Sequence, residues 1–262
     1  MLSLTQGRRL SASQGAPIPT PFKSFQHNGI HFRKGSLSLV AAAPGAGKSA
    51  LVQSIVQRGD GDGGKASAFY FSADSTANEV FTRAAAMATG YQLGEVERLM
   101  IEGGQDMLEA AVKSEAGHVR YSFKSSLTLD DVDEELAAYA AVYGAFPDII
   151  VVDNLMDLDA GMDDEFRNLG EASLYLKDTA RLTGAAVIAL HHVGGEHENG
   201  GKPIPLGGLR GKVSKIPALV LTLHRASGLK VSVVKNRSGK ADPSGNYGVE
   251  LSADLSRMWF DG

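Results

Sequence analysis

The sequence contains no cysteine among its 262 residues. Disulfide bonds and thiolate metal sites are therefore excluded, and nothing points to an oxidising compartment. No run of about 18 apolar residues is present, so we expect no membrane-spanning helix. Arg8 and Arg9 are not followed by the apolar stretch of a secretory leader. These absences make a cytoplasmic location the expectation.

An excess of positive charge is also missing, because the formal net charge is -4. Bulk charge therefore does not indicate a nucleic-acid partner, although a local basic lining can still bind one. The hydrophobic fraction of 43% and the charged fraction of 21% are typical of a globular protein with a sizeable core. The length suits one α/β domain with additions, or at most two small domains.

A phosphate-binding pattern is present in residues 36–50, SLSLVAAAPGAGKSA. A short β-prone run passes into a loop of small residues, then Lys48 and Ser49, and then a helix-forming stretch. This is the order of a P-loop, in which backbone N–H groups and the helix N-terminus bind phosphate. We expect Lys48 to reach the β- and γ-phosphates and Ser49 to bind Mg²⁺. The residues expected to contact the nucleotide are Ala43, Pro44, Gly45, Ala46, Gly47, Lys48, Ser49 and Ala50.

One position departs from the P-loop consensus, because Ala42 stands where the first glycine is usual. Alanine is the smallest substitute for that glycine. The alternative interpretation is a glycine-rich turn with a surface lysine, and the strand and helix patterns on either side disfavour it. The sequence therefore predicts a nucleotide-binding protein.

Two further strands are predicted to end in carboxylates. Residues 66–72 form a buried strand that is followed by Asp74, which either orients an attacking water or caps the next helix. Residues 147–153, PDIIVVD, contain four consecutive β-branched residues and end in Asp153. Such a strand is buried on both faces, and an acid at its end is expected to hold Mg²⁺. Asn154 and Asp157 lie nearby as lesser candidates.

A strand over residues 184–190 ends at His191 and His192. A polar residue there could sense the γ-phosphate. Two alternatives are a packed histidine pair and a metal site that adds His197 and Glu198, and the metal site lacks the helical i, i+4 spacing that would support it.

The last third of the chain contains a long polar loop, residues 194–208, and then a predicted hairpin of strands 218–223 and 229–234. The second strand leads into Lys235 and Arg237, which project to the same side because one residue separates them. A solvated basic turn is the plain alternative. Residues 1–30 are expected to be an N-terminal arm or linker, with a single ATPase domain over 31–262.

Together these segments resemble the RecA-like ATPase core of hexameric replicative helicases of the DnaB type, over about residues 32–260. That family has a P-loop, a strand ending in Ser-x-Glu, an acid-ended strand, a polar strand tip, a Leu-Arg element and a Lys-x-Arg-x-Gly element. The matching residues are 42–49, 72–74, 149–153, His191 with His192, 209–211 and 235–239. The family usually has glutamine at the strand tip, and histidine there is closer to the RepA and KaiC relatives.

The resemblance implies an α/β fold with a mostly parallel sheet, helices on both faces and an antiparallel extension near the C-terminus. By that resemblance Asp74 stands at the position of the catalytic glutamate. Since aspartate is one methylene shorter, Glu79 is an alternative base. His192 is the sensor. Lys235 and Arg237 match cations that reach the ATP of a neighbouring subunit.

The implied function is a Mg-ATP-dependent helicase or translocase on single-stranded DNA, working as a hexameric ring or a filament, with primase or loader proteins as possible partners. Residues 158–165 and 194–208 fall where such proteins contact DNA, and the candidate phosphate contacts are Lys202, Arg210 and Lys212. Two alternatives stay open: a recombinase or annealing protein that uses ATP as an assembly switch, and a regulatory ATPase without DNA.

Overall fold

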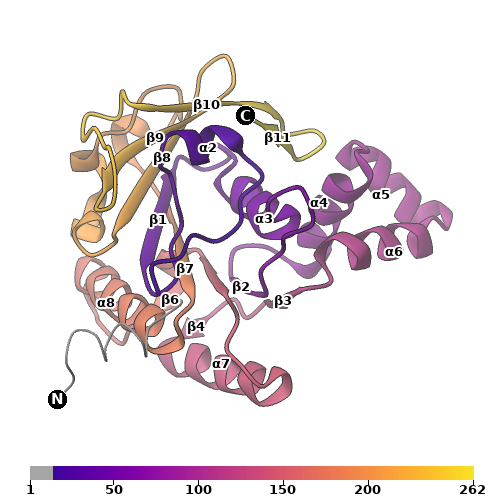
Figure 1. Cartoon of the computed structure of the whole chain (residues 1–262), viewed down its shortest axis with the longest axis horizontal. Coiled ribbons are helices and arrows are strands. Elements are labelled where there is room, and N and C mark those ends of the chain that lie inside the picture. Colours follow the sequence, from indigo (N-terminus) through magenta and orange to yellow (C-terminus); the bar gives the residue numbers. More distant parts are fainter. Residues whose placement is uncertain (1–13) are drawn as a thin grey trace.

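The computed structural model describes residues 14–262, and for residues 210–212 it describes the backbone alone. Its core is a nine-stranded sheet in the order β11-β10-β9-β8-β1-β7-β5-β2-β3 (Figure 1). The six strands from β8 to β3 are parallel, and β9, β10 and β11 are antiparallel. The strands are β1 (Leu37–Ala42), β2 (Ala68–Ser72), β3 (Val119–Ser122), β5 (Ile149–Asp153), β7 (Ala186–His192), β8 (Leu219–Arg225), β9 (Leu229–Asn236), β10 (Gly248–Asp254) and β11 (Trp259–Asp261).

The central strands are apolar along their whole length because both of their faces are covered. Every residue of β1, β2 and β5 is buried. Continuous apolar runs of this kind are typical of parallel strands packed between two layers. The predicted α/β fold with a mostly parallel sheet is therefore confirmed.

The helices form two groups. In the first, α3 and α4 contact each other and α6, and α5 packs on α4 and α6, so that α5 and α6 project from the sheet as a lobe (Figure 1). The second group consists of α7 and α8, which are joined by a hydrogen bond from the Tyr175 hydroxyl of α8 to the backbone oxygen of Leu129 in α7. The helices are α3 (Lys48–Arg58), α4 (Ala77–Thr89), α5 (Leu93–Glu102), α6 (Gln105–Ala116), α7 (Leu129–Tyr143) and α8 (Glu165–Thr183).

The predicted C-terminal hairpin is present and longer than expected. Strands β8 and β9 pair from Leu219↔Asn236 to Arg225↔Leu229, and β10 and β11 continue the antiparallel part. The turn 255–258 between β10 and β11 reaches back over the beginning of α3, where Leu255 lies beside Gly47 of the P-loop. Smaller elements are a strand pair, β4 (Leu127–Thr128) with β6 (Leu158–Asp159), and the 3₁₀ turns η1 (Leu155–Asp157), η2 (Gly195–His197), η3 (Leu206–Gly208) and η4 (Arg210–Lys215).

The segment before β1 is packed where it is described. It contains the short helix α2 (Lys23–His27). Ile18, Phe22, Phe25 and Ile30 are buried in the same core as the sheet. The expected arm 1–30 is thus described from residue 14 onward, and its first 13 residues lie outside the described part. Within residues 14–262, no helix is both long enough and apolar enough to cross a membrane.

Candidate active site

The P-loop connects the end of β1 to the beginning of α3. Gly45 and Gly47 have φ angles of 69° and 101°, which a side chain disfavours, so glycine is required at both positions. Ala42 is a strand residue without a positive φ. This explains why alanine is compatible with the fold at the first position of the motif. No side chain caps the N-terminus of α3, so its N–H groups stay available to an anion.

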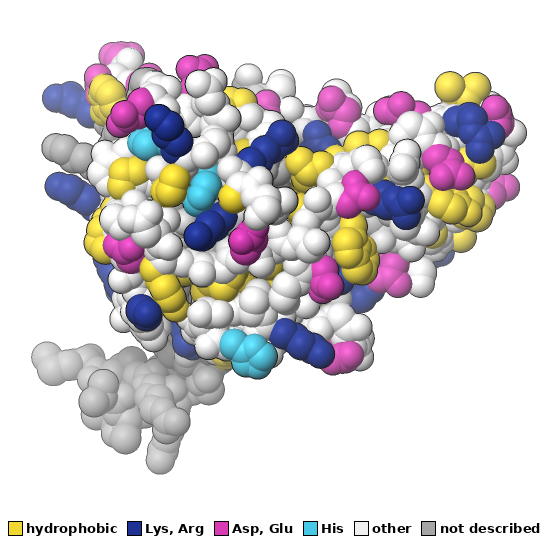
Figure 2. All heavy atoms as spheres, turned by 90° about the horizontal axis from the view of Figure 1, so that it is seen from above, with side chains coloured by type: hydrophobic (Ala, Val, Ile, Leu, Met, Phe, Trp, Pro, Cys, Tyr) yellow, Lys and Arg dark blue, Asp and Glu magenta, His cyan; other side chains and the backbone are white. Residues whose placement is uncertain are grey.

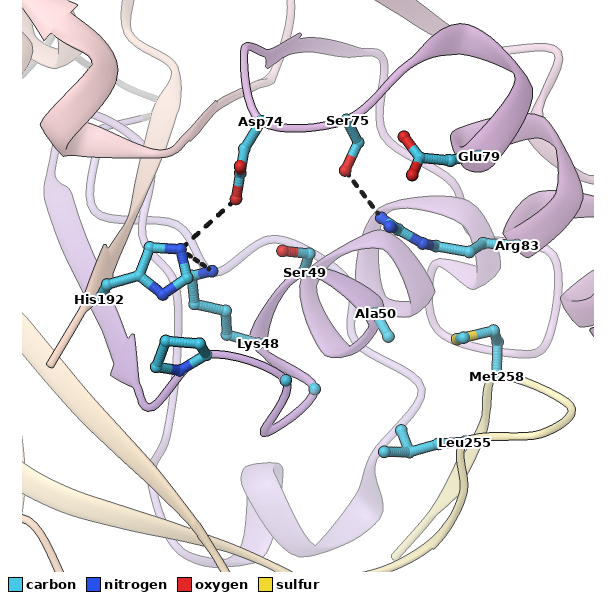
Figure 3. A pocket seen from close by; sticks show the side chains of 13 residues that line it. Lys48, Ser49, Ala50, Asp74, Ser75, Glu79, Arg83, His192, Leu255 and Met258 are labelled. Carbon is cyan, nitrogen blue, oxygen red and sulfur yellow. Dashed lines mark hydrogen bonds and ion pairs between the residues drawn. The ribbon is translucent and has the colours of Figure 1, made fainter. Parts of the chain in front are cut away.

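Lys48 and the two neighbouring strand ends meet in one place. The register pairs Ala42 with His192, so the end of β7 lies beside the start of the P-loop. Nζ of Lys48 lies 3.0 Å from Nε2 of His192, and the same histidine nitrogen lies 3.4 Å from Oδ2 of Asp74 (Figure 3). The structure thus brings together Lys48, Asp74 and His192, although Lys48 and His192 are 144 positions apart in the sequence.

Lys48 is only 5% exposed. Burial lowers the pKa of Lys48, and the negative charges of Asp153, Asp74 and Asp157 partly offset this effect. These carboxylates favour the charged lysine, which is the form that binds phosphate.

Asp153, expected to hold Mg²⁺, is the last residue of β5. The register pairs it with Ser72, two residues before Asp74. Oδ2 accepts a hydrogen bond of 2.9 Å from the Tyr70 hydroxyl, whereas Oδ1 is buried and has no hydrogen-bond partner among the described groups. An unpaired buried carboxylate oxygen fits a hydrated cation, so Asp153 and Ser49 suit the expected Mg²⁺.

Asp157, at the end of the 3₁₀ turn that follows β5, is a further acid of this cluster. Burial is the main cause that raises the pKa of Asp157, and the nearby negative charge of Asp74 raises it further. Its Oδ2 is buried without a hydrogen-bond partner among the described groups. The sequence marked it only as a lesser candidate beside Asp153.

A cavity of about 480 Å³ opens beside Lys48, Asp74 and His192, whereas Asp153 and Asp157 are not among its lining residues (Figure 3). Of the eight expected nucleotide contacts, Ala43 and Ala46 are buried and do not line it. Its lining consists of Pro44, Gly45, Gly47, Lys48, Ser49, Ala50, Asp74, Ser75, Glu79, Arg83, His192, Leu255 and Met258.

Four lining residues were not expected from the sequence, namely Ser75, Arg83, Leu255 and Met258. Arg83 of α4 points into the cavity, and its guanidinium donates to the hydroxyl of Ser75 over 3.2 Å. Leu255 and Met258 come from the β10–β11 turn, more than 200 residues after the P-loop. No local pattern in the sequence predicts Leu255 or Met258 as lining residues. Arg83 was predictable, because it lies about two turns into the helix that follows Asp74.

Glu79, the alternative base, is engaged elsewhere. It forms a capping box with Thr76 at the start of α4, and its carboxylate accepts from the Thr76 N–H and hydroxyl. The hydrogen bonds from Thr76 lower the pKa of Glu79. The cap therefore fixes Glu79 at the cavity rim, while Asp74 contacts His192 directly.

Lys235 and Arg237 lie near the beginning of β1, whereas the P-loop of the same chain follows the end of β1. Asn236 pairs with Leu219, which lies beside Ser38 at the beginning of β1. The Lys235 ammonium donates to the backbone oxygens of Ser214 and Lys215, each over 2.7 Å. The two cations are thus held far from the cavity that the same chain forms.

The remaining candidates lie in and after the 194–208 loop. Lys202 is exposed, and the side chains of Arg210 and Lys212 lie outside the described part. His191 is buried, and burial lowers its pKa to about 4, so it is neutral near pH 7. Among the described side chains, no group of three or more His, Asp or Glu is arranged to hold a metal ion.

Fold and site together define a P-loop ATPase, and comparison with known proteins gives its family. The model of the AAA domain matches residues 8–198, so the chain belongs to the AAA domain family as a RecA-like member. The Gene 65 protein of Mycobacterium phage L5 is 39% identical over 255 residues, which cover 94% of this chain and 92% of that protein. The Gene 65 protein of Mycobacterium phage D29 is 41% identical over 219 residues, covering 79% of this chain and 91% of the relative.

Solved structures support the same fold. A DnaB-like replicative helicase, studied with its interactions with primase, superimposes with a TM-score of 0.79 at 16% identity; the match covers 98% of this chain but 64% of the helicase chain. A separately solved ATPase domain gives 0.77 at 16% identity, with 98% and 96% of the two chains covered. A KaiC-like protein from Pyrococcus horikoshii gives 0.63 at 13% identity, with 94% and 98% covered. The chain is therefore a RecA-like ATPase domain related in fold to DnaB-like helicase domains.

Proposed function

We propose that this protein is an ATP-driven motor on single-stranded DNA, a helicase or translocase that hydrolyses Mg-ATP at the interfaces of an oligomer. One observation carries the proposal. The phosphate cavity lies at the carboxyl end of the central strands, and two ordered cations, Lys235 and Arg237, lie at the opposite end of those strands. A head-to-tail arrangement of copies brings the cations of one to the cavity of the next.

In the proposed reaction Lys48 and the N–H groups of the P-loop bind the β- and γ-phosphates. When bound, Mg²⁺ neutralises phosphate charge, with Ser49 and Asp153 as its protein ligands. Asp74 orients the attacking water and accepts its proton. His192 contacts both Lys48 and Asp74, so it can report whether a γ-phosphate has drawn Lys48 away. Arg83 adds a second cation from the same chain.

A DNA partner is supported by the charge of the last third of the chain. Residues 202–240 contain lysines and arginines but no aspartate or glutamate. The described cations of this stretch form no ion pair with a described carboxylate. Lys and Arg side chains project at the end of the molecule away from the α5–α6 lobe (Figure 2). Unpaired surface cations attract a phosphate backbone without regard to sequence.

A regulatory ATPase that does not bind DNA is the second candidate. The segment after β5 contains only negative charges, namely Asp157, Asp159, Asp163, Asp164 and Glu165. Such a segment repels phosphate, at a place where the proposed motor is expected to contact DNA. The fold is also similar to that of a KaiC-like protein.

ATP hydrolysis with and without single-stranded DNA distinguishes the candidates. The proposal predicts hydrolysis that DNA stimulates, and Lys202→Ala should weaken this stimulation while leaving the DNA-free rate unchanged. Hydrolysis that is indifferent to DNA would favour the regulatory ATPase. ATP-dependent annealing of complementary strands without any strand separation would favour the recombination protein. Particle mass measured with ATP then separates a closed ring, with one discrete mass, from a filament with a distribution of lengths.

A further inference from the structure

The last residue of β8, Arg225, joins two loops that are far apart in the sequence. Its guanidinium Nη2 donates to the backbone oxygen of Gly45 in the P-loop. Its own backbone N–H donates to the oxygen of Gly200, in the 194–208 loop, over 2.7 Å. One exposed side chain at a rigid strand end thus holds the nucleotide loop, and the backbone of the same residue holds the polar loop.

The two loops also touch each other directly at Gly200. This residue has a φ of +64°, and a Cβ atom placed on it would lie 3.2 Å from the Cβ of Ala43 and 3.9 Å from that of Ala46. Glycine is therefore needed both for the backbone conformation and for the close approach. At the beginning of the loop, the N–H of Val193 donates to the oxygen of Ala42. The polar loop accordingly rests on the P-loop itself.

We propose that Arg225 is a positioning residue that couples the occupancy of the P-loop to the conformation of the 194–208 loop. The inference rests on the proposed function in one respect, that a nucleotide occupies the P-loop. A phosphate held by the P-loop N–H groups reorients the peptide units of that loop, including the Gly45 carbonyl that Arg225 binds. The change is passed to Gly200 through the end of β8 and through the contact with Ala43. Because coupling is reciprocal, a ligand of the 194–208 loop alters nucleotide affinity to the same extent.

Amide hydrogen–deuterium exchange of the full chain, with and without saturating Mg-ADP, tests the coupling. In the unaltered protein we expect ADP to change exchange in residues 195–204 by about fivefold, the lower range of coupling between sites. Arg225→Ala should still bind ADP but lose this change in the loop. Arg225→Lys, which keeps one donor for the Gly45 oxygen, should retain part of it. Arg98→Ala is the matched control, because Arg98 is an exposed arginine paired with Glu102 on α5.

The outcomes separate the coupling from the proposed function. Failure of the unaltered protein to bind ADP in a fluorescence titration would overturn both. ADP binding without any change in loop exchange would overturn the coupling alone, as would a full response in Arg225→Ala. If Arg225→Ala does not fold, Arg225→Met decides the question, because it keeps the aliphatic stem of the side chain and removes the donor to the Gly45 oxygen. A response as large as that of the unaltered protein would contradict the coupling.

Discussion

The Nζ atom of Lys48 lies 3.0 Å from Nε2 of His192, so the side chain that is to bind phosphate is held by the end of the neighbouring strand. An ammonium group can only donate, so Nε2 of His192 is the acceptor in this contact. Nε2 then has no proton to offer Asp74, which lies 3.4 Å away. When Lys48 moves to a phosphate, Nε2 becomes free for a new partner.

The first prediction concerns this histidine. His192→Ala should lower kcat by about 10²-fold with little change in ATP affinity, because Lys48 and the P-loop still bind the phosphates. His192→Gln should keep most of the activity, since its amide reaches the same partners. Steady-state kinetics of the two variants check this. Equal losses in both, or a loss confined to KM, would contradict a sensor role.

The second prediction separates the two candidate bases. Asp74→Asn should lower hydrolysis by about 10²- to 10⁴-fold, because the amide cannot accept a proton. Glu79→Gln should leave both hydrolysis and stability nearly unchanged, since glutamine also completes the capping box with Thr76. The measurement is single-turnover ATP hydrolysis. Activity that persists in Asp74→Asn and disappears in Glu79→Gln would assign the base to Glu79.

The sequence carried enough information to predict the central part of this site. Residues 36–50 and 147–153 are local patterns in which strand, turn and functional side chain are adjacent, and the parallel arrangement brings the strand ends together. Leu255 and Met258 could not be predicted, because the β10–β11 turn reaches the cavity only through the antiparallel order of the last strands. The same holds for Arg225, whose role depends on a contact with Gly45, 180 residues earlier in the chain.

The third prediction tests the shared active site. Arg237→Ala should bind ATP normally, while hydrolysis falls by about 10³-fold or more, the usual contribution of an arginine finger. Lys48→Ala should be inactive for a different reason, since it lacks a phosphate ligand at its own cavity. Mixing the two variants should restore part of the activity, because some interfaces then combine an intact cavity with an intact Arg237. An additive rate without recovery would rule out a shared site.

The fourth prediction is a pH dependence of stability that arises from buried His191. Burial lowers its pKa from 6.5 to about 4, so between these values the unfolded chain binds a proton that the folded protein does not. The free energy of unfolding should therefore fall as the pH drops from about 7 to about 4, by about 3 kcal/mol at most from this residue. Its ring nitrogens have no hydrogen-bond partner among the described groups, so His191→Leu leaves no donor or acceptor unpaired.

Urea unfolding at pH 5 and pH 7.5 measures this effect. His191→Leu should flatten the difference between the two pH values, whereas the control His27→Gln, at an exposed position, should preserve it. An unchanged difference in His191→Leu would show that other groups cause the acid sensitivity.

The most direct test of the proposed motor is strand separation of a fluorescently labelled forked DNA in the presence of Mg-ATP. We predict separation that requires ATP and is abolished in Lys48→Ala, a variant that lacks the phosphate ligand. Separation by Lys48→Ala at the normal rate, or no separation by an unaltered protein that hydrolyses ATP, would contradict a helicase.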